Sequence, residues 1–195
     1  MNFAQLVKKN RSCRRFDESR TISPETLYGL VDLARISASA RNLQPLKYLV
    51  SYQEETNKII FPHLAWAGYL ESWDGPEEGQ RPAAYILVFL DHHIAPSPDC
   101  DHGIAAQTML LAAAEAGLGG CMIGSVRRKA LTAALDVPDH LELLMAVALG
   151  VPAEQVVIEE IRPDEDVKYW RDSSGVHHVP KRSLEHILIQ PGNKE

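Results

Sequence analysis

The densest group of chemically useful side chains lies near the N-terminus, in the segment Arg11-Ser12-Cys13-Arg14-Arg15-Phe16. Guanidinium groups hold phosphate through paired hydrogen bonds, and a neighbouring hydroxyl can add another. A second basic point, Lys181-Arg182, lies near the C-terminus. On a chain with a formal net charge of −6, two local basic points suit a small anionic ligand. From charge alone, a solvated basic face is the commoner explanation of the first segment.

Two further segments would let a flat ligand approach the backbone. In Ser39-Ala40-Arg41-Asn42-Leu43-Gln44-Pro45, the amides of Asn42 and Gln44 could hydrogen-bond to the edge of a ring, although an ordinary turn explains the same residues. In Gly119-Gly120-Cys121-Met122-Ile123-Gly124, glycine permits close approach. This cluster is not a dinucleotide fingerprint, because it ends a helix rather than opening one. A helix C-cap explains Gly117 or Gly119 but not Gly124.

Metal ligands and nucleophiles are less evident. The eight histidines are scattered, and no four-ligand zinc spacing is visible, so we expect no metal site. The adjacent pairs His92-His93 and His177-His178 would point to opposite faces of a strand and would not share a metal. The cysteines do not suggest a disulfide framework, and we expect Cys13 and Cys121 to be buried or structural.

Composition narrows the function classes. A chain of 195 residues without an obvious break favours one domain, residues 1–195. The acidic balance argues against a nucleic-acid partner, which would need basic surface. No apolar run reaches the roughly 18 residues that span a bilayer, and the N-terminus lacks the order of a signal peptide, so we expect no membrane association and a cytoplasmic location.

The elements that would position these segments alternate between helices and strands. We expect helices at 2–10, from Ser23-Pro24-Glu25 onward, at 54–61, at 127–135 and in the last part of 179–188, and strands at 46–52, 83–91 and 143–151. The arrangement indicates an α+β or three-layer fold. From Val156 onward the chain is polar.

The segment 99–117, opened by the cap signal Ser97-Pro98-Asp99, predicts an alanine-rich helix with almost no polar face. Such a helix must be buried on all sides, in a subunit interface or, alternatively, inside one subunit. The irregular segment 63–81 contains Trp66, Tyr69 and Trp73, which need cover or a ligand. Core packing and a place at the mouth of a pocket are equally compatible with these aromatics.

Taken in order, these segments resemble the nitroreductase family. Residues 11–16 resemble its R-S-x-R-x-F signature, and residues 39–45 resemble its S-A-x-N-x-Q-P segment. The alanine-rich helix with Gly117-Leu118-Gly119-Gly120 and Ile123-Gly124 resembles its central helix and glycine region. Val179-Pro180-Lys181-Arg182 resembles the C-terminal P-K-R ending of many shorter members.

The resemblance implies an α+β, three-layer sandwich with a mixed, mostly antiparallel sheet. It also implies an intertwined homodimer that exchanges C-terminal segments, about 156–195 here, and binds FMN at its interface. Arg11 and Arg182 would hold the phosphate, assisted by Lys181, and Ser12 would bond to the phosphate or ribityl chain. The other implied contacts are Arg14 at the pyrimidine edge, Ile123 and Gly124 near N5 and O4, and residues of the segment 39–45. These last are Ser39, Ala40, Asn42 and Gln44, of which Ser39, Ala40 and Asn42 would be supplied by the other subunit.

The implied activity is an FMN-dependent NAD(P)H oxidoreductase that reduces nitroaromatics, quinones or related small-molecule acceptors by ping-pong hydride transfer. The flavin would carry the chemistry, so no catalytic side chain is needed. One alternative is a flavin-binding or redox-sensing module without turnover. Another is specialised chemistry, such as flavin fragmentation or reductive dehalogenation. The short segment 63–81 bears most on this choice, since larger members shape their substrate pocket there.

Overall fold

Two apolar runs form the centre of the main sheet. In the computed structural model, which describes residues 1–189 and 191, β3 (Ala84–Asp91) is buried along its whole length and pairs with β5 (Leu141–Pro152). β2 (Leu46–Ser51) pairs with the other edge of β3, while β4 (Gly119–Ile123) and β1 (Phe16–Asp17) pair with β5. All of these pairings are antiparallel.

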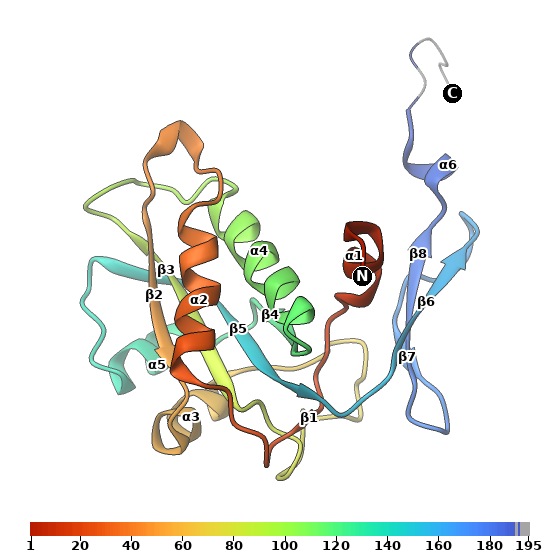
Figure 1. Cartoon of the computed structure of the whole chain (residues 1–195), viewed down its shortest axis with the longest axis horizontal. Helices are drawn as coiled ribbons and strands as arrows, with labels where there is room; N and C mark the ends of the chain where they lie inside the picture. The colour runs from red at the N-terminus through yellow and green to blue at the C-terminus, as the bar shows by residue number, and fades with distance from the viewer. Residues whose placement is uncertain (190, 192–195) are drawn as a thin grey trace.

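Helices cover both faces of this sheet because side chains of β3 alternate between them. Ala84, Ile86 and Val88 share a core with α2 (Pro24–Arg35) and α4 (Asp101–Glu115). Tyr85, Leu87 and Phe89 share a second core with α3 (Glu54–Ile60) and α5 (Arg128–Ala134). Figure 1 shows these helix pairs on opposite sides of the sheet. The predicted α+β, three-layer arrangement is confirmed.

The helix predicted from Ser23 onward has the expected start. Ser23 Oγ accepts a hydrogen bond from the Thr26 N–H at 3.2 Å, and Pro24 occupies the first turn. Leu27, Leu30 and Ala34 are buried on one face. By contrast, the cap signal predicted at Ser97-Pro98-Asp99 is wrong. α4 begins at Asp101, and Asp99 adopts a left-handed φ of 44° in a turn before the helix.

Only one side of α4 is covered within the chain. Ala106, Met109 and Ala113 lie in the core, whereas the side chain of Ile104 is 38% exposed and Gln107 is also exposed. The alternative of a helix fully internal to one subunit is therefore wrong. The predicted burial of the other side in an interface stays a prediction.

The chain beyond β5 forms a second sheet that the sequence did not predict. β6 (Val156–Ile161) pairs parallel to β8 (His177–Arg182), and β7 (Trp170–Arg171) pairs antiparallel to β8. The short helix α6 (Leu184–Ile187) follows, near its predicted position. Residues 156–189 are called the C-terminal arm below. Residues 190 and 192–195 of the predicted exchanged segment lie outside the described residues.

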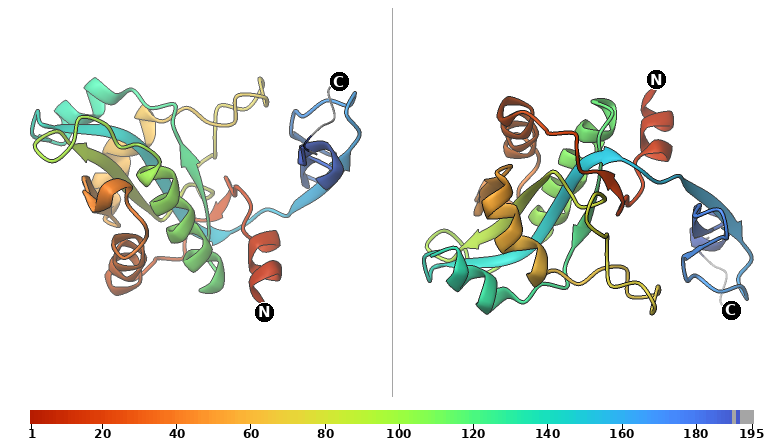
Figure 2. Two further views of the ribbon diagram at one scale, coloured as in Figure 1. Left: turned by 90° about the horizontal axis from the view of Figure 1, so that it is seen from above. Right: turned by 90° about the horizontal axis from the view of Figure 1, so that it is seen from below.

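The arm stands apart from the main sheet, and both views of Figure 2 show the same separation. The helix α1 (Phe3–Lys9) lies between them in Figure 1 and, although helical as predicted, buries none of its residues. Two 3₁₀ turns, Ala40–Asn42 and Phe61–His63, complete the helical elements of the described chain. Within residues 1–189, no helix is long and apolar enough to cross a membrane.

Candidate functional site

The basic N-terminal segment is held in place by the start of β4. Ser12 forms a parallel bridge with Gly120, and the Cys13 N–H donates to the Gly120 carbonyl at 3.0 Å. Because neighbouring side chains of an extended segment point to opposite sides, buried Cys13 leaves Ser12 and Arg14 facing outward. A Cβ at Gly119 would lie 3.1 Å from the Cβ of Cys13, so glycine permits this close approach.

This packing corrects the predicted role of the glycine cluster. Gly117, with a φ of 79°, follows α4 as a C-terminal glycine. Gly119 and Gly120 instead belong to β4, where their lack of a side chain makes room for neighbouring segments. The cluster therefore serves the sheet as well as the helix end.

A cavity of about 370 Å³ brings together four of the predicted site residues: Arg11, Ser12, Arg14 and Lys181. We call it the basic cavity. Three cationic side chains line it, and no carboxylate is among its lining residues. Such a site favours an anion, because guanidinium and ammonium groups form charge-assisted hydrogen bonds with phosphate or carboxylate.

The Arg11 side chain is already oriented. Its Nε donates to the Asn10 carbonyl at 2.6 Å, and its Nη2 donates to the Val7 carbonyl at 2.8 Å, at the C-terminal end of α1. Burial lowers the pKa of Arg11, because desolvation disfavours the charged form. An arginine held in this way loses less conformational entropy when it binds an anion.

A second cavity, of about 170 Å³, contains Ile123 and Gly124. We call it the Gly124 cavity. Arg14, Met122 and Tyr169 line both cavities, so the two adjoin. No heavy atom lies within 4 Å of the place where a Cβ on Gly124 would stand. The pair of cavities can therefore accept an elongated ligand with an anionic group at one end and a group near the Gly124 backbone at the other.

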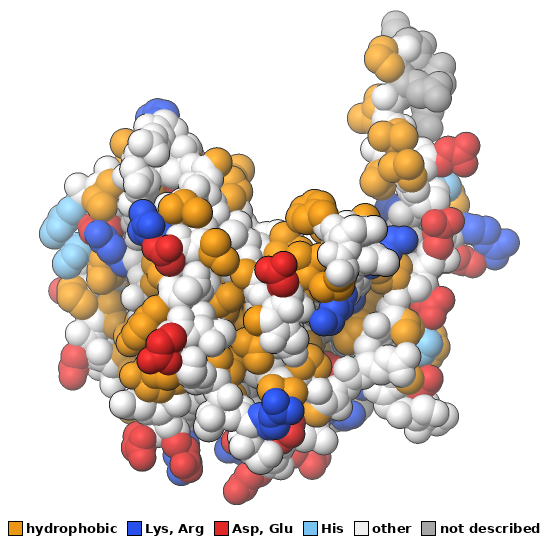
Figure 3. All heavy atoms as spheres, in the orientation of Figure 1, with side chains coloured by type: hydrophobic (Ala, Val, Ile, Leu, Met, Phe, Trp, Pro, Cys, Tyr) orange, Lys and Arg blue, Asp and Glu red, His pale blue; other side chains and the backbone are white. Residues whose placement is uncertain are grey.

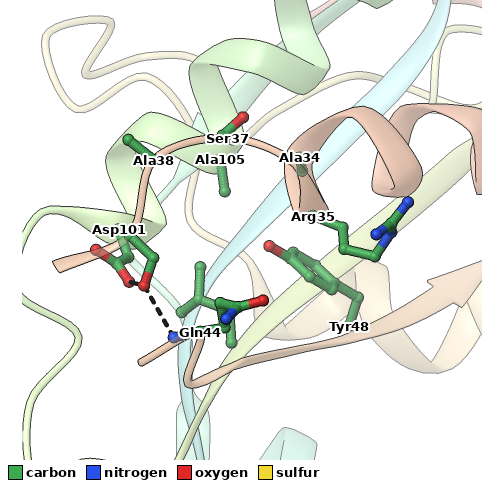
Figure 4. A pocket seen from close by; sticks show the side chains of 10 residues that line it. Ala34, Arg35, Ser37, Ala38, Gln44, Tyr48, Asp101 and Ala105 are labelled. Carbon is green, nitrogen blue, oxygen red and sulfur yellow. Dashed lines mark hydrogen bonds between the residues drawn. The ribbon is translucent and has the colours of Figure 1, made fainter. Parts of the chain in front are cut away.

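The other predicted segment, Ser39 to Gln44, lies elsewhere. Ser39 and Gln44 line a separate cavity beside the N-terminus of α4 (Figure 4). Buried Asp101 organises this loop, because its carboxylate accepts hydrogen bonds from Ser39 Oγ at 2.6 Å and from the Ala40 N–H at 2.8 Å. The structure thus does not bring Ser39, Ala40, Asn42 and Gln44 to the basic cavity of the same chain.

The backbone of this loop is strained. Arg41, Asn42 and Gln44 have φ values of 51°, 55° and 53°, in the left-handed region that non-glycine residues rarely adopt. Such conformations persist where the surrounding structure holds them, often at ligand sites. Asp101 and the bond from the Gln44 N–H to Ser39 Oγ, at 2.9 Å, provide that support.

Arg182 does not line the basic cavity, although its neighbour Lys181 does. The two residues are consecutive in β8, so their side chains point to opposite faces of the arm. Within the described chain, the structure therefore places Lys181, rather than Arg182, beside Arg11 and Arg14.

Sequence reasoning missed a buried group behind the basic cavity. Glu154, whose side chain is 1% exposed, accepts hydrogen bonds from the N–H groups of Arg14 at 2.5 Å and Arg15 at 3.2 Å. Its other oxygen pairs with Arg171 of β7 at 2.8 Å. The guanidinium of Arg171 lies 4.2 Å from the ring centroid of Trp73. Glu154 thus links the basic segment, the arm and the segment 63–81, which no local spacing could have revealed.

The arm also contributes Tyr169 and His177 to the basic cavity. The Arg14 guanidinium lies 5.0 Å from the Tyr169 ring centroid, and the ring centroids of Tyr69 and Tyr169 are also 5.0 Å apart. Burial lowers the pKa of His177 to about 4, although Glu154 opposes the shift, so this ring is neutral at pH 7. His177 and His178 point to opposite faces of the strand, as predicted for neighbours. His177 is fully buried, whereas the ring of His178 stacks on Trp170.

The aromatics of segment 63–81 divide between the two predicted roles. Trp66 is buried in the second core and also lines the Gly124 cavity. Tyr69 is 51% exposed and packs against Tyr169.

The predicted structural role of the thiols agrees with the geometry, because burial raises the pKa of Cys13 and Cys121 to about 12.

Comparisons with known proteins match most of the residues of this chain. The sequence model of the Nitroreductase family matches residues 7–151. The NADPH-flavin oxidoreductase of Vibrio harveyi is 27% identical over 180 residues, which cover 83% of this chain and 69% of that protein.

Two solved structures show the same fold. A nitroreductase family protein from Clostridium difficile 630 has a TM-score of 0.64 at 25% identity, covering 79% of this chain and 86% of that one. A structure from Exiguobacterium sibiricum 255-15, solved in complex with FMN, has a TM-score of 0.65 at 20% identity and covers 79% of this chain and 90% of that one. Because the family model matches well over half of its residues, the chain belongs to the Nitroreductase family.

Proposed function

We propose that the chain is an FMN-dependent NAD(P)H oxidoreductase that reduces nitroaromatic, quinone or related acceptors. The observation that carries this proposal is the adjoining pair of cavities, cationic at one end and open at the Gly124 backbone at the other. FMN has the matching form, a phosphate joined through a ribityl chain to a flat ring. The Vibrio harveyi relative is named for NADPH and flavin, and the Exiguobacterium sibiricum structure contains FMN.

In this proposal, Arg11, Arg14 and Lys181 neutralise the phosphate end, with Arg14 reaching toward the pyrimidine edge, and Ser12 bonds to the phosphate or ribityl chain. The Ile123–Gly124 backbone lies beside the ring edge that contains N5 and O4. Bound FMN would supply the hydride chemistry between the nicotinamide and the acceptor. The nearby positive charge and N–H donors would stabilise the negative charge of the reduced ring.

We further infer a homodimer that completes the site. The loop with Ser39 and Asn42 is fixed beside Asp101, whereas Gln107 and Leu110, six and nine residues later in α4, line the basic cavity. Six to nine helical residues rise by roughly 9–13 Å. This separation explains why the loop would serve the FMN of a second copy rather than its own.

Exposed apolar side chains support the same inference. Seven such side chains occur on the arm. Others are Phe3 and Val7 on α1 and Ile104 on α4. Figure 3 shows apolar side chains along the projecting arm. An isolated chain gains little by exposing so many large apolar groups, and a partner that covers them would exchange its own arm in return. The exposed apolar side chains of the arm are Ile158, Val167, Trp170, Leu184, Ile187, Leu188 and Ile189.

Replacing Ile104 with glutamate is expected to convert dimers into monomers, because it places a charge on the uncovered side of α4. Light scattering at a fixed protein concentration measures the change. Lys129→Glu on exposed α5 is the matched control and should leave the dimer intact. Leu110→Glu is unsuitable, since Leu110 is in the core and its change would test folding. A dimer unaffected by Ile104→Glu would remove this side of α4 from the interface.

Lys181→Ala is expected to weaken FMN binding by about 1.5–3 kcal/mol, the scale of a charged hydrogen bond. Arg182→Ala is the matched comparison on the opposite face of β8, and we expect a smaller loss. Fluorescence titration of the apoprotein with FMN measures both affinities. A larger loss for Arg182→Ala would assign the phosphate to Arg182 instead.

The decisive experiment on the function is an absorption spectrum of the purified protein, followed by anaerobic reduction with NADH and NADPH. We expect a yellow protein and bleaching by at least one nicotinamide. A colourless protein that takes up no added FMN would refute the proposal. Flavin binding with turnover no faster than free FMN would indicate a binding module instead. Gly68, Met122 and Gly124 around the Gly124 cavity are exposed in the single chain, which favours turnover provided that the partner subunit leaves this end of the site open.

A further inference from the structure

A second group of ligating side chains lies at the end of the main sheet. The antiparallel register places Asp91, the last residue of β3, opposite Leu141, the first residue of β5. The turn that follows β3 therefore lies beside the residue before β5. The His92 N–H accordingly donates to the His140 carbonyl at 2.9 Å.

Three side chains converge at this point: Asp91, His93 and His140. One potential ligand atom from each lies within 4.8 Å of the other two. The imidazole rings of His93 and His140 stack with centroids 4.2 Å apart. The Asp91 side chain is only 10% exposed. Its Oδ1 accepts a hydrogen bond from the backbone N–H of His93 at 3.0 Å and lies 4.0 Å from the Nδ1 of the same histidine. The carboxylate is thus held in place, toward the histidines.

We propose that Asp91, His93 and His140 bind a divalent transition-metal ion of the zinc class. Two imidazole nitrogens and one carboxylate oxygen are the donors that such ions prefer, and water would complete the coordination. No residue of the basic cavity takes part, so this proposal does not depend on the flavin.

The side chains need only a small adjustment to bind the ion. Tetrahedral ligands at about 2.1 Å from zinc lie roughly 3.4 Å from one another. The observed spacings, which reach up to 4.8 Å, must therefore close by up to about 1.4 Å. Because a nitrogen lone pair lies in the plane of its ring, the stacked rings must also turn toward each other. The His93 side chain is 73% exposed and free to make that turn.

Charged side chains near the three ligands would change the affinity for the metal ion. Lys47 of β2 places its Nζ 3.8 Å from Asp91 Oδ2, where it competes with a bound cation. Its side chain is half exposed and can move away into solvent. His92 instead faces Glu142, with 2.9 Å between Nε2 and Oε2, and is not part of the proposed ligand set.

The test is a calorimetric titration of the untagged full-length protein, with its flavin, against Zn²⁺. We expect one site per chain that is lost or weakened at least about tenfold in His93→Ala and in His140→Ala, since even the loss of a group that only supports a ligand costs 10–100-fold. His92→Ala is the matched control and should bind as the original protein does. Lys47→Ala should bind several-fold more tightly.

Unchanged zinc affinity in both His93→Ala and His140→Ala would overturn the proposal. A loss in His92→Ala equal to that in His93→Ala would overturn the assigned ligand set. Circular dichroism of each variant separates loss of ligands from loss of fold. The flavin spectrum should be the same with and without zinc, so failure here is distinguishable from failure of the proposed function.

Discussion

Replacing Glu154 with alanine is expected to lower the free energy of unfolding by roughly 3–5 kcal/mol, the cost of leaving one charge of a buried pair without its partner. Arg171 would lose its carboxylate partner while its side chain stays 11% exposed. The N–H groups of Arg14 and Arg15 would lose their acceptor as well. Because these groups belong to the basic segment and the arm, FMN affinity should fall together with stability.

Urea unfolding monitored by circular dichroism measures the effect. Glu160→Ala is the matched control, because Glu160 is exposed on β6 and its loss should change stability by no more than about 0.5 kcal/mol. The double variant Glu154→Ala with Arg171→Met should recover part of the loss, since no buried charge is left unpaired. Equal stability of Glu154→Ala and Glu160→Ala would show that the buried pair does not stabilise the fold.

Gly120→Val is expected to destabilise the protein by roughly 3 kcal/mol or more, at the upper end of the range for overpacking. The first added carbon would lie 2.4 Å from the Ala148 carbonyl oxygen and 2.8 Å from the Leu110 Cδ2. Ala148 belongs to central β5 and cannot move without disturbing its neighbours. The strand β4 would have to shift, and the Cys13–Gly120 hydrogen bond would weaken with it.

Gly29→Ala serves as the control for Gly120→Val. No heavy atom lies within 4 Å of the added carbon at Gly29, and alanine favours a helix over glycine, so a gain of up to about 1 kcal/mol is expected. Thermal unfolding and FMN titration should both detect the change at Gly120. A Gly120→Val protein as stable as the Gly29→Ala protein would contradict the tight packing of β4 against β5.

Local patterns were sufficient for much of the fold. The cap at Ser23 with its apolar spacing placed α2, and the continuous apolar run at 83–91 placed β3, because both signals arise within a few neighbouring residues. The start of α4 was less accurate, since Asp99 forms a turn that resembles a cap in sequence. The arm strands were missed because charged side chains interrupt the apolar positions of β6 and β8.

The sequence by itself determined the family resemblance, the three layers and the segments that contain Arg11, Ser12, Arg14, Gly124 and Lys181. Only the tertiary structure decided which of them meet. It placed Lys181 in the basic cavity with Arg182 outside it, and it kept the Ser39 loop at the other end of α4. It also joined Glu154 to Arg171, and His93 to His140. These contacts depend on strand register and on how the arm docks, which are set by packing between segments far apart in the chain.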